Sequence, residues 1–335
     1  MRIDKSLSRF GFGSSGIGNL YQVISQEQAH EAVAAALSVG VTYFDTAPHY
    51  GFGLSEKRLG ASLRTLDPEQ NVVVSTKVGR TLAAVPKVDV SVPRQGFISP
   101  EPFESQFDYS YDSIMRSFEE SSARLQRGID VLYVHDIGRR THGERHPALF
   151  KQFISEGYRA MRKLRDGGAV AAIGIGVNEC EVCEEALAEA EFDLILLAGR
   201  YTLLEQAALD RFFPLCERRE VSVVIGGPYN SGILARGVHG QSTPKYDYQT
   251  APSHVVQKVV AIEEICDRYA VPLAAAALQF PLAHPQVLSV VPGMSGAQEV
   301  LQAAKWLAYK IPNEFWSELR DRELVRSDAP LPVAR

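Results

Sequence analysis

The sequence predicts a (β/α)₈ barrel (a TIM barrel) with long loops at the C-terminal face of its strands. Short, β-branched apolar runs alternate with amphipathic segments along the chain, and this alternation repeats eight times. Such continuous apolar runs are typical of parallel strands, because helices cover both faces of a parallel sheet. No Pro/Ser-rich linker divides the pattern, so residues 1–335 are expected to form a single domain.

Each predicted strand is a run of five to eight residues, which is too short for a buried helix. The eight strands, in order, are Phe10–Ser14, Val41–Thr46, Val72–Lys77, Val131–Asp136, Val170–Val177, Leu194–Ala198, Val221–Gly226 and Val287–Pro292. A segment with apolar residues three and four positions apart follows each strand and predicts a helix. These helices are Gln26–Val39, Ser55–Leu63, Tyr111–Arg127, Glu156–Asp166, Cys180–Glu189, Gln206–Arg219, Val255–Tyr269 and Ser295–Leu307.

Two connections are longer than a barrel requires. They are residues 78–108, after the third strand, and residues 228–253, after the seventh. Long loops in a compact domain are usually lids or binding loops, and the Pro, Gly, Tyr and Phe residues here favour ordered structure. We therefore expect both loops to contribute to a binding site.

Composition and charge exclude several classes of partner. The chain has 35 basic and 40 acidic side chains, a net charge of −5, and therefore no excess of positive charge for nucleic acid. It has no apolar run long enough to span a bilayer and no signal-peptide pattern at its start, so we expect a cytoplasmic protein that binds no membrane. Cys180 and Cys183 are spaced C-x-x-C without a second pair, and we interpret them as ordinary helix cysteines rather than a metal site. The oligomeric state is not predicted.

A glycine motif near the start allows two interpretations. Residues 11–16 fit G-x-G-x-x-G, the phosphate-binding pattern of dinucleotide-binding domains, with Asp45 as the acidic partner. However, the next predicted helix begins only near Ser25, and the distance from Gly16 to Asp45 exceeds the usual spacing of about 20 residues. We therefore expect these glycines to line the mouth of the first barrel strand.

In a barrel of this kind the active site lies at the C-terminal ends of the strands, so we looked for ionisable groups there. Asp45, Lys77 and His135 end the second, third and fourth strands, and Tyr50 follows Asp45 by five residues. Each residue alone has an ordinary structural explanation, such as capping a loop. Together they predict a site for proton transfer on one side of the barrel mouth.

The expected roles follow from electrostatics. An ammonium group close to a phenol stabilises the phenolate and lowers its pKa, so Lys77 is expected to make Tyr50 more acidic. Asp45 is expected to hold Lys77 in place. A neutral His135 is expected to donate a hydrogen bond to the substrate oxygen and orient it.

The sequence resembles the aldo-keto reductase family over essentially its whole length. The motifs that carry the resemblance are Phe44-Asp45-Thr46-Ala47, Tyr50-Gly51, Ser55-Glu56, Ser75-Thr76-Lys77, Leu132-Tyr133-Val134-His135, Ile173-Gly174 and Val291-Pro292-Gly293. The resemblance implies that Asp45, Tyr50, Lys77 and His135 are the catalytic tetrad. It also implies a nicotinamide cofactor lying across the barrel mouth, with hydride passing between its ring and a carbonyl or carbinol carbon.

The resemblance also implies where the cofactor is held. The family uses a Ser-Asn pair after the fifth strand, of which this chain keeps Asn178. Residues 226–228 are Gly-Gly-Pro where the family often has an aromatic residue against the nicotinamide, unless Tyr229 reaches back to that place. The remaining expected cofactor contacts are Gly227, Asn230 and Gly232 after the seventh strand, and Gly293, Ser295 and Glu299 after the eighth.

The segment after the eighth strand favours NAD over NADP. Members of the family that use NADP bind its 2′-phosphate there with a lysine and an arginine, whereas residues 292–299 contain no basic side chain and Glu299 would repel a phosphate. Each missing contact is worth about 1.5–3 kcal/mol. The alternative is that Lys305 or an arginine from another loop binds the phosphate.

Three further segments, residues 47–51, 197–205 and 226–232, are similar to one branch of the family. Its members oxidise the hemiacetal carbon of an aldose, such as L-fucose, D-arabinose or L-galactose, or of pyridoxal, and form a lactone. The substrate is thus expected to be a small molecule, with an aldose first and pyridoxal as the alternative, and with His49 and Arg200 as contacts. A cofactor-holding regulatory subunit without turnover remains a third possibility.

Overall fold

The computed structural model describes residues 7–85, 87–239 and 243–333 and contains the predicted barrel. Eight parallel strands form one sheet in the order β1-β2-β3-β6-β7-β8-β9-β12. They are β1 (Phe12–Gly13), β2 (Tyr43–Asp45), β3 (Val73–Val78), β6 (Val131–His135), β7 (Ala172–Val177), β8 (Leu194–Ala198), β9 (Ser222–Gly226) and β12 (Val287–Val291). Parallel bridges from Phe10 to Val290 and from Gly13 to Gly293 join the first strand to the last.

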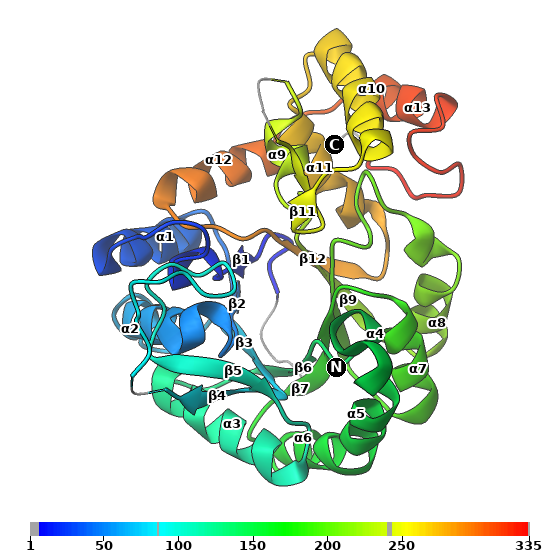
Figure 1. The fold of residues 1–335 in the computed structure, drawn as a ribbon. Helices are drawn as coiled ribbons and strands as arrows, with labels where there is room; N and C mark the ends of the chain where they lie inside the picture. Colours follow the sequence, from blue (N-terminus) through cyan, green and yellow to red (C-terminus); the bar gives the residue numbers. More distant parts are fainter. Residues whose placement is uncertain (1–6, 86, 240–242, 334–335) are drawn as a thin grey trace.

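Helices surround the sheet, as Figure 1 shows. Those at the predicted positions are α1 (Gln26–Ser38), α2 (Leu54–Leu66), α3 (Tyr111–Leu125), α6 (Tyr158–Asp166), α7 (Glu181–Glu189), α8 (Phe212–Arg218), α10 (Ser253–Tyr269) and α12 (Ala297–Leu307). Three shorter helices lie in connections: α4 (Arg139–His142), α5 (His146–Gln152) and α9 (Ile233–Arg236). In the part of the chain that the structure describes, no helix combines the length and hydrophobicity that crossing a membrane requires.

Besides these three short helices, the described residues contain two further helices that were not predicted, and one of them corrects the assignment of the seventh barrel helix. Helix α11 (Leu273–Gln279) packs against α12 and α9, whereas α10 lies farther out beside α13 (Asn313–Asp321) (Figure 1). The interior of α11, Ala274–Leu278, is entirely buried. A helix buried on all sides has no polar face, so the amphipathic pattern that revealed the other helices is missing from α11.

Both long loops are ordered by small antiparallel hairpins. Residues 78–108 contain β4 (Arg80–Ala84) paired with β5 (Phe103–Phe107). Residues 228–253 contain α9 and the short pair β10 (Lys245–Tyr246) and β11 (Gln249–Thr250). Residues 86 and 240–242 lie outside the described part of these loops.

The alternation of side chains along the strands separates two cores. The inner core fills the barrel and consists of Tyr43, Val73, Val131, Tyr133, Ala172, Leu194, Leu196, Val224 and Val291. Neighbouring residues on the same strands, such as Phe44, Val74 and Leu132, point outward and pack under the helices. Burying one such apolar side chain stabilises the fold by about 1.5–3 kcal/mol. The packed interior supports the strand ends that form the barrel mouth.

The glycine motif lies at the first strand, and its contacts close the barrel. Gly13 donates a backbone hydrogen bond to Pro292 O at 3.0 Å and accepts one from Met294 N at 3.0 Å. A Cβ atom on Gly13 would lie 2.7 Å from Pro292 O, closer than real side chains allow. Gly16–Gly18 form a 3₁₀ turn rather than the start of a long helix. These glycines therefore allow the ends of β1 and β12 to touch.

Candidate active site

The structure brings the four predicted residues together at the C-terminal ends of neighbouring strands. Asp45 ends β2, Lys77 lies near the end of β3, and His135 ends β6. Tyr50 opens the 3₁₀ turn Tyr50–Gly53 directly after β2. Asp45, Lys77 and His135 are 3%, 2% and 6% exposed. Charged groups buried to this degree must be paired, because removing them from water is otherwise too costly.

Lys77 and Asp45 satisfy this requirement. Lys77 Nζ donates to Asp45 Oδ2 at 2.7 Å and to the carbonyl oxygen of Thr46 at 2.7 Å. An ammonium group has three hydrogens, so these two bonds leave one for another partner. Lys77 Nζ lies 5.0 Å from the centre of the Tyr50 ring. The expected association of this lysine with both Asp45 and Tyr50 is therefore present.

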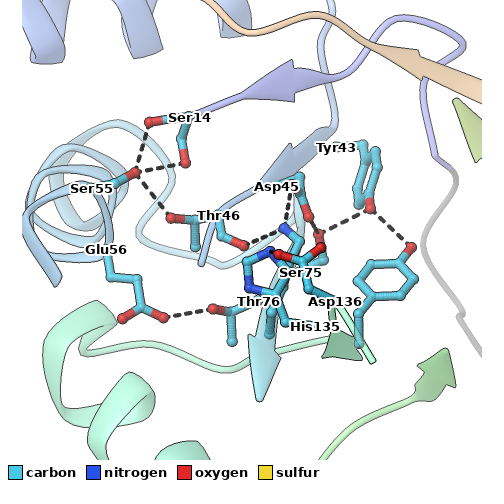
Figure 2. A network of polar contacts seen from close by, with 12 residues as sticks. Ser14, Tyr43, Asp45, Thr46, Ser55, Glu56, Ser75, Thr76, His135 and Asp136 are labelled. Atoms are coloured by element: carbon cyan, nitrogen blue, oxygen red, sulfur yellow. Dashed lines mark hydrogen bonds and ion pairs between the residues drawn. The ribbon is translucent and has the colours of Figure 1, made fainter. Parts of the chain in front are cut away.

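A chain of hydroxyl groups leads to Asp45, as Figure 2 shows. Ser75 donates to Asp45 Oδ1 at 2.7 Å, Tyr43 OH lies 3.0 Å from Ser75 Oγ, and Tyr133 OH lies 3.1 Å from Tyr43 OH. Tyr43, Ser75 and Tyr133 each precede a tetrad residue by two positions on the same strand, so they point into the barrel. Our sequence reasoning missed them, although this two-residue spacing was a usable signal.

The His135 ring lies beside Tyr50. The two ring centres are 6.2 Å apart and the planes are nearly perpendicular, at 88°. Burial lowers the pKa of His135 well below its ordinary value, and the positive charges of Lys77 and Arg80 lower it further. The ring is therefore neutral at physiological pH, as the sequence analysis expected.

The direction of the Tyr50 pKa corrects our expectation. Burial raises the pKa of Tyr50 well above its ordinary value, and the carboxylates of Asp45 and Asp136 raise it further. Arg80 opposes the rise, but does not outweigh it. The expected lowering of this pKa by Lys77 is therefore wrong for the protein alone, because burial dominates and Arg80, not Lys77, is the cation that opposes it.

Sequence reasoning also missed a second ion pair at the site. Arg80, the first residue of β4, donates from Nη1 to Asp136 Oδ2 at 2.9 Å. The same Oδ2 lies 3.5 Å from His135 Nε2. Asp136 directly follows a strand, so a search for ionisable strand ends contained the signal, but His135 was taken instead. Arg80 gave no such signal, because only the β4–β5 hairpin places it here.

The two predicted substrate contacts lie in different surroundings. His49 is buried, with its ring 5.2 Å from that of Phe97 and 6.2 Å from that of His135. Arg200 donates to Asp247 Oδ1 at 2.6 Å and to the carbonyl oxygen of Asn178 at 2.8 Å. Arg200 thus connects the segments after β7 and β8 to the β10–β11 hairpin. The role of both residues toward a substrate stays a prediction.

The predicted cofactor residues follow β7, β9 and β12, on the part of the mouth that does not carry the tetrad. Asn230 is buried and joins two loops, because its Oδ1 accepts from Thr202 Oγ1 at 2.6 Å and its Nδ2 donates to Gly199 O at 3.1 Å. Gly227 and Gly232 have positive φ angles of 54° and 94°, which favour glycine. These loops are therefore held in defined conformations.

The segment before α12 has a compact polar arrangement. Glu299 accepts hydrogen bonds from the Ser295 backbone N–H at 2.7 Å and from Ser295 Oγ at 2.9 Å. Gln22, from the loop after β1, donates to Ser295 Oγ at 2.6 Å. Tyr229 packs against Trp306 of α12, with ring centres 6.3 Å apart. Among the described residues no contact joins Tyr229 to the tetrad, so the structure does not show it reaching back.

Comparison with known proteins agrees with this geometry. The model of the aldo/keto reductase family matches residues 9–323. The chain is 40% identical to a pyridoxal 4-dehydrogenase of Microbacterium luteolum over 97% of this chain and 96% of that protein. It is 39% identical to a D-threo-aldose 1-dehydrogenase of a Pseudomonas species over 96% of this chain and 95% of the other.

Solved structures give the same result. The holo form of an aldo-keto reductase from Bacillus halodurans superimposes with a TM-score of 0.70 at 25% identity, covering 96% of this chain and 94% of that one. Family match, sequence identity, barrel and strand-end residues all agree. The chain is an oxidoreductase of the aldo/keto reductase family.

Proposed function

We propose that this protein is an NAD-dependent aldose 1-dehydrogenase, which oxidises the hemiacetal carbon of a sugar such as L-fucose, D-arabinose or L-galactose to a lactone. The observation that carries the proposal is the meeting of Tyr50 and His135 with the buried Lys77–Asp45 pair at one place on the barrel mouth. The similarity to a D-threo-aldose 1-dehydrogenase over almost the whole chain supports it.

In this proposal each residue of the tetrad has one task. The bound nicotinamide supplies the chemistry of hydride transfer from C1. Tyr50 takes the proton from the C1 hydroxyl, and neutral His135 donates a hydrogen bond to the reacting oxygen. The remaining N–H of Lys77 is available to stabilise the Tyr50 oxygen when it is negative, while Asp45 and Thr46 O hold the lysine in place.

The raised pKa of Tyr50 has a direct consequence for the direction of the reaction. The neutral phenol is the stable form, so Tyr50 serves readily as an acid in reduction. Oxidation requires it to lose its proton first. We therefore expect the oxidation rate to depend steeply on pH.

The residues after β9 and β12 suit an extended, flat cofactor. A Cβ atom on Gly296 would meet no atom within 4 Å, and one on Gly227 would meet its nearest neighbour only at 3.9 Å, so open space lies beside both backbones. Asn178, Gly227, Tyr229, Asn230, Gly232, Gly293, Ser295 and Glu299 are the residues we propose to hold it. The Glu299 carboxylate in the first turn of α12 favours NAD over NADP, because it would repel a 2′-phosphate.

Pyridoxal is the second candidate substrate, oxidised at C4 to 4-pyridoxolactone. His49, Phe52 and Phe97 form a buried aromatic cluster, in which the His49 and Phe97 rings each lie 6.4 Å from the Tyr50 ring. The 40% identity to a pyridoxal 4-dehydrogenase supports this alternative.

The test is turnover with a panel of aldoses and pyridoxal. The absorbance of reduced nicotinamide reports the rate with NAD and with NADP, and mass spectrometry identifies the lactone. We expect the highest kcat/KM for an aldose with NAD. A higher value for pyridoxal would select the second candidate. Tight cofactor binding without turnover across the panel would contradict both and support a regulatory subunit.

A further inference from the structure

Asp136 lies next to His135, although it does not belong to the tetrad. Its Oδ2 is 3.5 Å from His135 Nε2, slightly longer than a hydrogen bond, and the side chain is 19% exposed. Figure 2 shows Asp136 beside the His135 ring. A carboxylate at this distance attracts a hydrogen on Nε2, and the Nε2–H group can still donate to a second acceptor.

The backbone of Asp136 is fixed in an uncommon conformation. Its φ angle is 52°, in the left-handed region that Asp and Asn tolerate better than most residues. The Asp136 N–H donates to Gly176 O at 3.0 Å, and the Tyr109 hydroxyl lies 2.9 Å from His135 O and 3.2 Å from Asp136 O. The chain therefore turns back sharply after β6 and keeps the carboxylate beside the histidine.

Arg80 holds this carboxylate from the other side. Its three nitrogens donate to Asp136 Oδ2, Ser105 Oγ and Gln95 Oε1, each at 2.9 Å. The guanidinium also lies 5.0 Å from the centre of the Phe107 ring. Every one of these partners except Asp136 belongs to residues 78–108. The long loop after β3 therefore holds the Arg80 guanidinium in place against Asp136.

The other nitrogen of His135 gives an independent indication. His135 Nδ1 is buried and has no hydrogen-bond partner among the described residues. A neutral imidazole carries one hydrogen, on either Nδ1 or Nε2. A hydrogen on Nδ1 would be a buried donor without an acceptor, which is rare in proteins, whereas a hydrogen on Nε2 faces a carboxylate.

We propose that Asp136 is a positioning residue that holds His135 in the tautomer with its hydrogen on Nε2, and that Arg80 fixes Asp136 for this task. The inference rests on the proposed function in one respect, namely that the Nε2–H meets the substrate oxygen. It adds an Arg80–Asp136 pair to the Lys77–Asp45 pair as a second ionic support of the site.

The decisive measurement is the ¹⁵N NMR spectrum of the histidine side chains in the full chain, with the His135 signals assigned through H135Q. We expect a pyrrole-type shift at Nε2 and a pyridine-type shift at Nδ1. In D136N we expect the two shifts to move toward each other, because the neutral amide no longer favours a hydrogen on Nε2. Asn tolerates the same φ angle, so D136N is expected to fold.

Two further variants complete the test. R80K keeps the positive charge but loses the fork that binds three partners, and we expect a smaller shift in the same direction. D89N, an exposed aspartate in the same long loop, is the control and should leave the His135 signals unchanged. A hydrogen on Nδ1 in the wild-type protein, or a tautomer that D136N does not alter, would overturn the proposal.

Kinetics separate this proposal from the proposed function. We expect kcat of D136N to fall by about 10- to 100-fold with little change in KM, the size of loss seen when the partner that orients a functional histidine is removed. If the wild-type protein turns over no aldose and no pyridoxal, the proposed function fails. The tautomer assignment then still stands or falls on the NMR result alone.

Discussion

The two halves of the barrel mouth differ in the kind of residue that lies at their strand ends. At or next to the ends of strands β2, β3 and β6 lie Asp45, Lys77 and His135, which are ionisable and buried. Strands β9 and β12 are followed by Gly227 and Gly293, which have no side chain. The half with β2, β3 and β6 therefore carries buried charged groups, and the half with β9 and β12 has positions without a side chain. We therefore propose that proton transfer and cofactor binding use opposite kinds of residue on one rim.

The halves also depend on each other sterically. A Cβ atom on Gly176 of β7 would lie 3.4 Å from Lys77 Cε. That distance is at the lower limit of ordinary van der Waals contact, so a side chain at position 176 would pack directly against Lys77. The following experiments test the division of tasks, from the largest expected effect to the smallest.

Tyr50→Phe tests the half that carries charge. Removing the hydroxyl that moves the proton should lower kcat by about 10²–10⁴-fold, the usual contribution of a general acid or base. NAD affinity, measured by calorimetry, should stay nearly unchanged, because the cofactor residues belong to the other half. Turnover at the wild-type rate would remove Tyr50 from the mechanism.

Lys77→Met tests the buried ion pair. It leaves Asp45 buried without its cation, and we expect the free energy of unfolding to fall by about 3–5 kcal/mol in urea denaturation. The matched control is the double variant Asp45→Leu/Lys77→Met, which removes both charges and should regain most of the loss. A double variant as unstable as the single one would show that packing, not the unpaired charge, is responsible.

The pH dependence of oxidation tests the corrected view of Tyr50. Its pKa lies above its ordinary value of 10.0, so between neutral pH and pH 10 the fraction of phenolate rises about tenfold per pH unit. The rate of oxidation should rise with that slope and show no plateau in this range, whereas reduction should be nearly constant. A plateau beginning near neutral pH would instead mean that Lys77 dominates in the working enzyme.

Gly13→Ala tests the close contact between the ends of β1 and β12. The new Cβ would lie 2.7 Å from Pro292 O, so the ends of β1 and β12 must separate, at a cost of about 1–3 kcal/mol in stability. Gly296→Ala is the control, because no atom lies within 4 Å of its Cβ position. Equal losses of Tm in both variants would show that close packing is not the reason for Gly13.

Glu299→Arg tests cofactor choice. Replacing a repelling carboxylate by a cation should lower the ratio of kcat/KM for NAD to that for NADP by about tenfold, near the lower end of a charged hydrogen bond. Glu299→Gln separates loss of the negative charge from gain of the positive one. An unchanged ratio in both variants would show that the 2′-position is recognised elsewhere, for example by Lys305.

Much of this architecture was predictable because parallel strands place their C-terminal ends on one rim. Once the eight apolar runs were assigned, the positions of Asp45, Lys77 and His135 relative to one another followed. The chain of hydroxyl groups on Tyr43, Ser75 and Tyr133 follows from the same alternation and was overlooked. What the strand pattern determines, the sequence therefore predicts well.

The remaining features depend on information that local patterns do not contain. Helix α11 has no polar face to reveal it. Arg80 reaches Asp136 only because the β4–β5 hairpin folds back over the mouth. The direction of the Tyr50 pKa depends on the burial of the phenol and on the carboxylates of Asp45 and Asp136, which only the folded chain brings close to it.

Gly13 stands at the boundary between the two halves. It pairs with Asp45 in the sheet and hydrogen-bonds to Pro292 O and Met294 N at the end of β12. A displacement of the β12 end would therefore act on β1 and, through the pairing of Gly13 with Asp45, on the strand of Asp45. We therefore expect a molecule bound at the end of β12 to shift the position of Asp45 through this contact.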